Sequence, residues 1–151
     1  MVIISIFSAI AIPGFQAVSD KVKQKEASIL LSSYLKAVQG FYIENGYLPK
    51  NSQDLSGFVS VFACSPKASN RSRCKDYSAI SIHKVQATSW VTPSGLYSTG
   101  IYISGDQVQF TANPTIIFNG FGVAACFNSK NRSTKIIEST TRKKLTSPPN
   151  C

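Results

Sequence analysis

The stretch that decides the fold is VIISIFSAIAIPGFQAVSDKVKQKEA, residues 2–27, at the N-terminal end of a chain of 151 residues. Its first half is apolar and uncharged, and it carries Pro13 and Gly14 within an otherwise helical run. At 1.5 Å per residue this apolar half reaches about 22 Å, whereas the hydrocarbon core of a bilayer is about 30 Å thick. The proline removes one helix hydrogen bond and predicts a kink or a local melting, which neighbouring helices could cover.

The helix is predicted to continue, because apolar residues recur every three or four positions after the apolar half. These residues are Ala27, Leu30, Leu31, Tyr34, Val38, Phe41 and Tyr42. Asn45-Gly46 is a typical C-terminal helix signal, and Pro49 prevents the helix from resuming. We therefore expect one helix over residues 2–44, roughly 60 Å long at 1.5 Å per residue.

After this helix the apolar residues alternate with polar ones, which is typical of strands. The predicted strands cover residues 77–85, 95–104, 107–111, 115–127 and 134–139. The run over 115–127 is one or two buried strands broken at Asn119-Gly120, and Gly105-Asp106 is a tight-turn signal. The predicted fold class is α+β, a long N-terminal helix packed on an antiparallel sheet of about four or five strands.

Four cysteines predict disulfide bonds. Cys64 and Cys74 bracket a polar segment, Cys126 closes an apolar run, and Cys151 is the last residue. Of the three pairings that four cysteines allow, we expect Cys64–Cys74 and Cys126–Cys151, the second of which ties down the polar tail. Disulfides place most of the chain in an oxidising compartment, either the periplasm or the cell exterior.

The chain is basic, with 16 Lys and Arg against 7 Asp and Glu and a formal net charge of +9. Ten of these cations lie in or directly beside the two cysteine-bounded segments, namely Lys67, Arg71, Arg73, Lys75, Lys130, Arg132, Lys135, Arg142, Lys143 and Lys144. Loops held by disulfides would present such charges to a phosphate backbone, so these residues are candidates for anion or DNA binding. The alternatives are a solvated basic surface and contacts to a neighbouring subunit.

No pattern typical of catalysis is found in the sequence. His83 is the one histidine, and no acid or nucleophile is spaced to act with it. The acids form no pair suited to acid–base chemistry, and the cysteines lack the spacing of zinc ligands. We expect no enzyme activity, no cofactor, no metal site and no small-molecule substrate.

Two short motifs carry a family resemblance. Residues 7–15, FSAIAIPGF, and residues 23–27, KQKEA, closely resemble the N-terminal helix of type IV pilins and type II secretion pseudopilins. Residues 41–55, FYIENGYLPKNSQDL, are similar to cyanobacterial pilins. Residues 118–145 are more weakly similar to H-type pseudopilins and related minor pilins.

The resemblance implies a pilin fold in which the chain has two parts with different roles. Residues 1–26 would be the membrane-anchor or filament-core half of the helix, and residues 27–151 the globular head. The residues that it places in the filament core are Ile4, Phe7, Ile10, Ile12, Pro13, Gly14 and Phe15. The family's prepilin-peptidase site would lie upstream of Met1, so we expect a start codon placed too late; a mature-like fragment and an unusual family member are the alternatives.

The function that the resemblance implies is a structural subunit, a pilin or minor pilin, of a type IV pilus or related filament. Its partners would be other pilin subunits, the pilus assembly machinery and, before assembly, the bacterial inner membrane; the assembled subunit would be extracellular. One alternative is a minor pilin that binds extracellular DNA through the basic loops. Others are a type II secretion pseudopilin and a secreted soluble domain with a cleaved leader.

Overall fold

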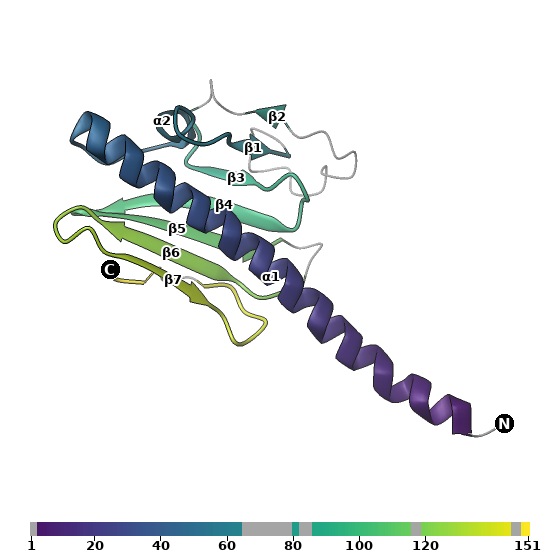
Figure 1. Cartoon of the computed structure of the whole chain (residues 1–151). Helices are drawn as coiled ribbons and strands as arrows, with labels where there is room; N and C mark the ends of the chain where they lie inside the picture. Colours follow the sequence, from purple (N-terminus) through teal and green to yellow (C-terminus); the bar gives the residue numbers. More distant parts are fainter. Residues whose placement is uncertain (1–2, 65–79, 82–85, 116–118, 146–148) are drawn as a thin grey trace.

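The computed structural model describes residues 3–64, 80–81, 86–115, 119–145 and 149–151, and in these ranges the side chains from Gln16 onward except those of residues 80–81. The chain forms one long helix lying across one face of an antiparallel sheet (Figure 1). This arrangement confirms the predicted α+β class and the predicted number of strands in the sheet.

Helix α1 spans Ile3–Asn45, 43 residues, as the period of its apolar residues predicts. It ends where expected, because Gly46 adopts a φ of 75° and its N–H donates to the Tyr42 carbonyl at 2.9 Å. The helix is continuous through Pro13, so the local melting that we considered there is wrong for this chain. A proline removes only one backbone hydrogen bond, and the turns on both sides keep theirs.

The main sheet is a meander in which strands follow each other in chain order, β3-β4-β5-β6-β7, with every neighbouring pair antiparallel. Its strands are β3 (Ser89–Val91), β4 (Tyr97–Ser104), β5 (Gln107–Pro114), β6 (Val123–Asn128) and β7 (Thr134–Glu138). Gly105-Asp106 makes the predicted tight turn, with a φ of 57° at Gly105. A separate pair is formed by β1 (Phe62–Ala63) and β2 (Ile80–Ser81).

Some strand predictions need correction. Within the predicted strand over 77–85 the structure describes only β2, which pairs with β1 outside the main sheet; His83 lies outside the described residues. Over 115–127 a strand forms only from Val123, since the residues described before it make a loop. Strand β3 and helix α2 (Ser52–Leu55) are not predicted from the sequence, because both are too short to show a periodic pattern. Asn51 is the N-cap of α2, and its side chain accepts hydrogen bonds from two backbone N–H groups.

The core lies between the predicted apolar stripe of α1 and the inner face of the sheet. Leu31, Tyr34 and Val38 of the helix are fully buried, as are Trp90 and Phe110 of the sheet. The Tyr34 and Trp90 rings meet edge to face at 5.7 Å between centroids, and the Trp90 indole N–H donates to the Tyr34 hydroxyl at 3.4 Å. Burial raises the pKa of Tyr34 to about 12, against the opposing effect of this hydrogen bond.

Candidate functional site

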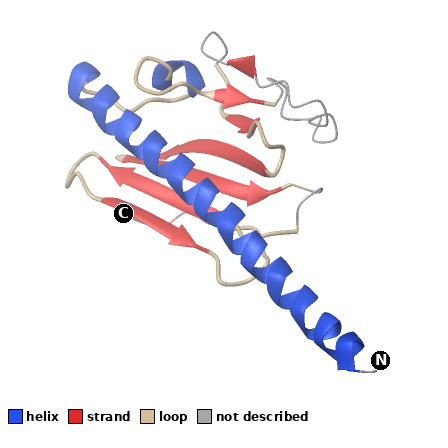
Figure 2. Cartoon of the chain, turned by 45° about the vertical axis from the view of Figure 1, so that its right-hand side comes forward, coloured by secondary structure: helices blue, strands red, loops and turns tan. Residues whose placement is uncertain are grey.

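The N-terminal part of α1 projects beyond the edge of the sheet as a free helix (Figures 1 and 2). Ile4, Phe7, Ile10, Ile12, Pro13, Gly14 and Phe15, the predicted filament-core residues, all lie along this projecting helix. No helix among the described residues is long and apolar enough to cross a membrane.

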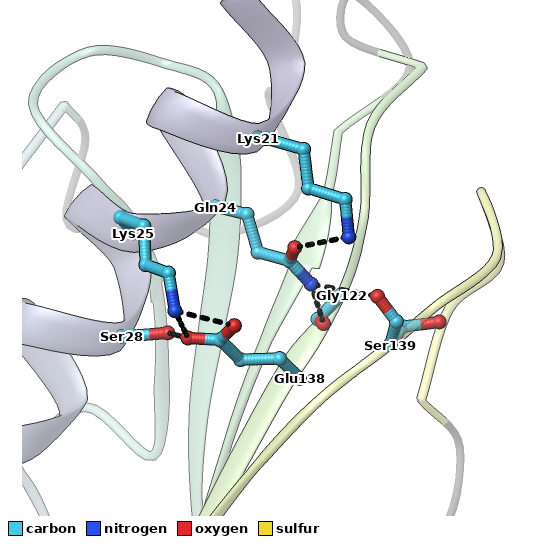
Figure 3. A network of polar contacts seen from close by, with 7 residues as sticks. All are labelled: Lys21, Gln24, Lys25, Ser28, Gly122, Glu138 and Ser139. Carbon is cyan, nitrogen blue, oxygen red and sulfur yellow. Dashed lines mark hydrogen bonds and ion pairs between the residues drawn. The ribbon is translucent and has the colours of Figure 1, made fainter. Parts of the chain in front are cut away.

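A set of polar and aromatic contacts, the helix clamp, holds α1 at the point where it leaves the sheet. Figure 3 shows its polar contacts around Gln24 and Glu138. Its members are Asp20, Lys21, Gln24, Lys25 and Ser28 of α1, and Phe121, Gly122, Glu138, Ser139 and Arg142 from the β6–β7 region. The clamp therefore joins segments that are about a hundred residues apart in sequence, as the separation of 98 between Gln24 and Gly122 illustrates.

Gln24 is the centre of the clamp. Its side-chain amide is 1% exposed and donates to the Gly122 carbonyl at 3.2 Å and to the Ser139 carbonyl at 2.9 Å. Its carbonyl oxygen accepts from Lys21 Nζ at 3.5 Å. A buried amide with partners for both its donor and its acceptor atoms specifies one position of the helix along the sheet.

Charged groups surround this amide. Lys25 Nζ lies 2.9 Å from Glu138 Oε2, and the Ser28 hydroxyl donates to Glu138 Oε1 at 2.6 Å. The hydrogen bonds from Ser28 and then Lys25 hold the pKa of Glu138 below its ordinary value.

Arg142 closes the clamp from the C-terminal tail, since its guanidinium lies 2.8 Å from Asp20 Oδ2. Both Arg142 and Lys21 also lie over the Phe121 ring, at 5.8 and 4.5 Å from its centroid. The clamp thus places the carboxylate of Asp20 and these cations in one compact group.

A second feature of α1 is its free face, which points away from the sheet. Val18, Val22, Ile29 and Ile43 are 62, 64, 71 and 83% exposed. Residues 22, 29, 36 and 43 are seven apart, the spacing that returns to one side of a helix and occurs in helix–helix seams. An apolar cavity of about 350 Å³ opens beside Ile29 and is lined also by Leu30 and Pro93.

The C-terminal tail is stapled to the outer face of the sheet, opposite α1. The predicted disulfide Cys126–Cys151 is present. Cys64 is also disulfide-bonded, whereas its expected partner, Cys74, lies outside the described residues.

Side-chain amides of β5 hold the tail in addition to the disulfide. Asn113 exchanges two hydrogen bonds with the Leu145 backbone at 2.7 and 3.1 Å, and Gln107 exchanges two with Cys151 at 3.2 and 3.5 Å. Between them, Gln109 donates to the Pro149 carbonyl at 3.5 Å. These residues alternate along β5, so they share its outer face.

The predicted basic residues do not gather in one patch among those that the structure describes. Arg132 lies in the turn after β6 and lines a cavity of about 410 Å³ with Tyr42, Ile43 and Phe127. Arg142, Lys143 and Lys144 follow β7 at the other end of that hairpin and line a cavity of about 320 Å³.

Two other cations of the predicted set, Lys130 and Lys135, are not among the residues that line either cavity. Lys130 pairs with Asp106 at 2.8 Å, and Lys135 is exposed on β7. The four cations near Cys74, Lys67, Arg71, Arg73 and Lys75, lie outside the described residues.

Sequence reasoning missed the helix clamp and the amides that hold the tail. Gln24 could have been noticed, because it precedes Ala27 by three residues and Leu31 by seven and so lies on the apolar stripe. Its partners could not have been predicted, since they are two backbone carbonyls in distant segments.

Comparison of the chain with protein families, with curated proteins and with solved structures finds no match. The α+β fold, with its long projecting helix and five-stranded antiparallel sheet, therefore stands on the geometry alone.

Proposed function

We propose that the chain is a structural subunit of a type IV pilus or a related filament, with a pilin fold, that assembles through its N-terminal helix. The observation that carries this proposal is the division of α1 into a half packed on the sheet and a half that projects beyond it. The projecting half contains no charge before Asp20 and is rich in Ile, Val, Phe and Ala.

Such a projecting helix needs a partner. Burying an Ile or Phe side chain contributes about 1.5–3 kcal/mol, so a row of them left in water favours association strongly. The exposed apolar residues of the free face extend this surface toward the sheet. Equivalent helices of neighbouring subunits can cover both, with the inner membrane covering the apolar half before assembly.

The helix clamp fits this role, because it fixes the direction in which the projecting helix leaves the head. In a filament every head must be held in the same orientation to its helix. The disulfide-stapled tail keeps the head folded outside the cell, and other proteins of the assembly machinery supply the energy for assembly.

The test uses the full chain in detergent, followed by dilution of the detergent, with sedimentation and electron microscopy as readouts. Substituting Val22→Asp together with Ile29→Asp places two charges on the free face and should abolish sedimentable assemblies. Ile103→Asp changes an exposed isoleucine near the end of β4, outside the free face of α1, and should leave assembly intact. Circular dichroism confirms that each variant is folded.

A parent chain that stays monomeric after detergent dilution would refute the proposal. The Val22→Asp, Ile29→Asp variant is compared directly with the parent. If it assembles to the same extent, the free face takes no part in assembly and that element of the proposal is refuted. Short rods in place of long filaments would favour the type II secretion pseudopilin.

A further inference from the structure

The outer face of the sheet is polar, and only part of it is covered. Ser98 and Tyr102 of β4 and Thr111 of β5 point outward, because the alternate residues of each strand face the α1 side and belong to the core. The tail covers β5 through the amides of Gln107, Gln109 and Asn113. A groove remains open over β4, beside the tail.

Tyr102 forms the floor of this groove by lying back along its own strand over Gly100. A Cβ atom at residue 100 would sit 2.6 Å from the Tyr102 hydroxyl and 2.9 Å from two ring carbons. Only glycine leaves room for the ring there, an arrangement known for glycines in sheets. Tyr102 is nevertheless 51% exposed, so the other face of the ring is open to solvent.

The ring borders a cavity of about 150 Å³ that the tail closes on one side. Ser98 and Thr111, which carry hydroxyl groups, line it, and Lys144 lines it from the tail. Lys144 and Pro114 also line the neighbouring cavity of about 320 Å³, which contains Lys143. The two cavities therefore join into one surface, the outer groove.

The outer groove is positively charged. None of the described residues that line it is acidic, and they include Arg142, Lys143 and Lys144. Arg142 is already paired with Asp20. Across the described ranges no ion pair is found for Lys143 or Lys144, so their charges are available to a ligand.

We propose that the outer groove binds single-stranded nucleic acid, with a base stacked on Tyr102 and the adjoining phosphates held by Lys143 and Lys144. A flat aromatic face beside cations that follow a backbone is the general arrangement by which proteins hold single strands. A duplex cannot offer the face of a base to the ring, so the groove should prefer single strands. This inference goes beyond filament assembly and does not depend on it.

An acidic polysaccharide is the competing ligand, since a sugar ring can also stack on tyrosine. Specific sugar binding relies on amides, carboxylates and guanidinium groups that hold two hydroxyls at once. Here the Asn113 amide is occupied by the Leu145 backbone and Arg142 by Asp20. Among the described residues around the ring, single hydroxyls and lysine remain, and the Asn119 amide lines only the other cavity of the groove. This favours a ligand held by stacking and charge.

The experiment measures fluorescence anisotropy of a labelled oligo(dT) of about 12 nucleotides, within the site sizes of single-strand binding folds, with the full chain in detergent. Tyr102→Ala should weaken binding about tenfold, since stacking of one base contributes about 1–3 kcal/mol, whereas Tyr102→Phe keeps the ring and should bind like the parent. Lys143→Gln with Lys144→Gln should reduce the salt slope of log K by about 1.4, at about 0.7 for each phosphate contact on a single strand.

Matched controls come from elsewhere on the surface. Tyr47→Ala removes an equally exposed tyrosine, and Lys36→Gln with Lys50→Gln removes two exposed lysines; neither should change binding. The proposal is overturned if the oligonucleotide does not bind at low salt or if a duplex of the same length binds as tightly. It is also overturned if Tyr102→Ala does not weaken oligonucleotide binding. The same holds if oligogalacturonate, added at the same total negative charge as the oligonucleotide, displaces it. These readouts use the unassembled subunit, so failure of filament assembly leaves them unaffected.

Discussion

Replacing Gln24 by leucine tests whether the helix clamp fixes α1 on the sheet. The substitution keeps most of the side-chain volume but removes both hydrogen bonds to the carbonyls of Gly122 and Ser139. A buried hydrogen bond contributes about 1 kcal/mol net, so the two together predict a loss of about 2 kcal/mol in the free energy of unfolding. For a chain of this size that corresponds to a fall of about 4–8 °C in Tm.

The assay is urea unfolding of the full chain in a non-denaturing detergent, followed by tryptophan emission and by circular dichroism. Trp90 is the one tryptophan of the chain and is fully buried against Tyr34, so its emission reports on the core between helix and sheet. Coincident transitions by the two probes establish two-state behaviour.

The matched control is Gln16→Leu, which makes the same change at an exposed position of the same helix. It should alter the free energy of unfolding by less than about 0.5 kcal/mol. A Gln24→Leu variant that behaves like this control would refute the conclusion that the buried amide holds the helix.

Three further perturbations probe the head. Glu138 has a lowered pKa, so its contribution to stability is complete above the unfolded value of about 4.3 and is lost as the pH falls through the lower folded value. Glu138→Gln should therefore flatten the acid side of the pH–stability curve, and an unchanged curve would contradict the ion pair. Cys126→Ala with Cys151→Ala removes a bond that closes 25 residues and should lower the urea-unfolding free energy by roughly 3 kcal/mol; a variant as stable as the parent would show that the β5 amides suffice. Val38→Ala removes two buried methyl groups and should cost about 2 kcal/mol by the same assay, whereas Val22→Ala on the free face should cost less than about 0.5 kcal/mol; similar losses for the two would contradict the assignment of the faces.

Local patterns in the sequence determined the helix and much of the sheet. The apolar stripe and Gly46 together predicted a helix that ends within one residue of the observed Asn45. The turn at Gly105-Asp106 predicted the β4–β5 hairpin because few sequences tolerate its backbone conformation. The pairing of Cys126 with Cys151, the one expected of the three possible pairings, was predicted from the polar tail that ends in Cys151.

Tertiary structure alone decided which polar groups meet. Asp20 and Arg142 pair although most of the chain lies between them in sequence, and the Gln24 amide donates to carbonyls next to β6 and β7, which are also distant in sequence. Gly100 lets the Tyr102 ring lie along its strand with the opposite ring face open, and the tail brings Lys144 to the same cavity. Periodicity predicts which side of a helix or strand is buried. The partner of a given side chain depends on how two elements pack, and this packing is set by the sum of all contacts between them.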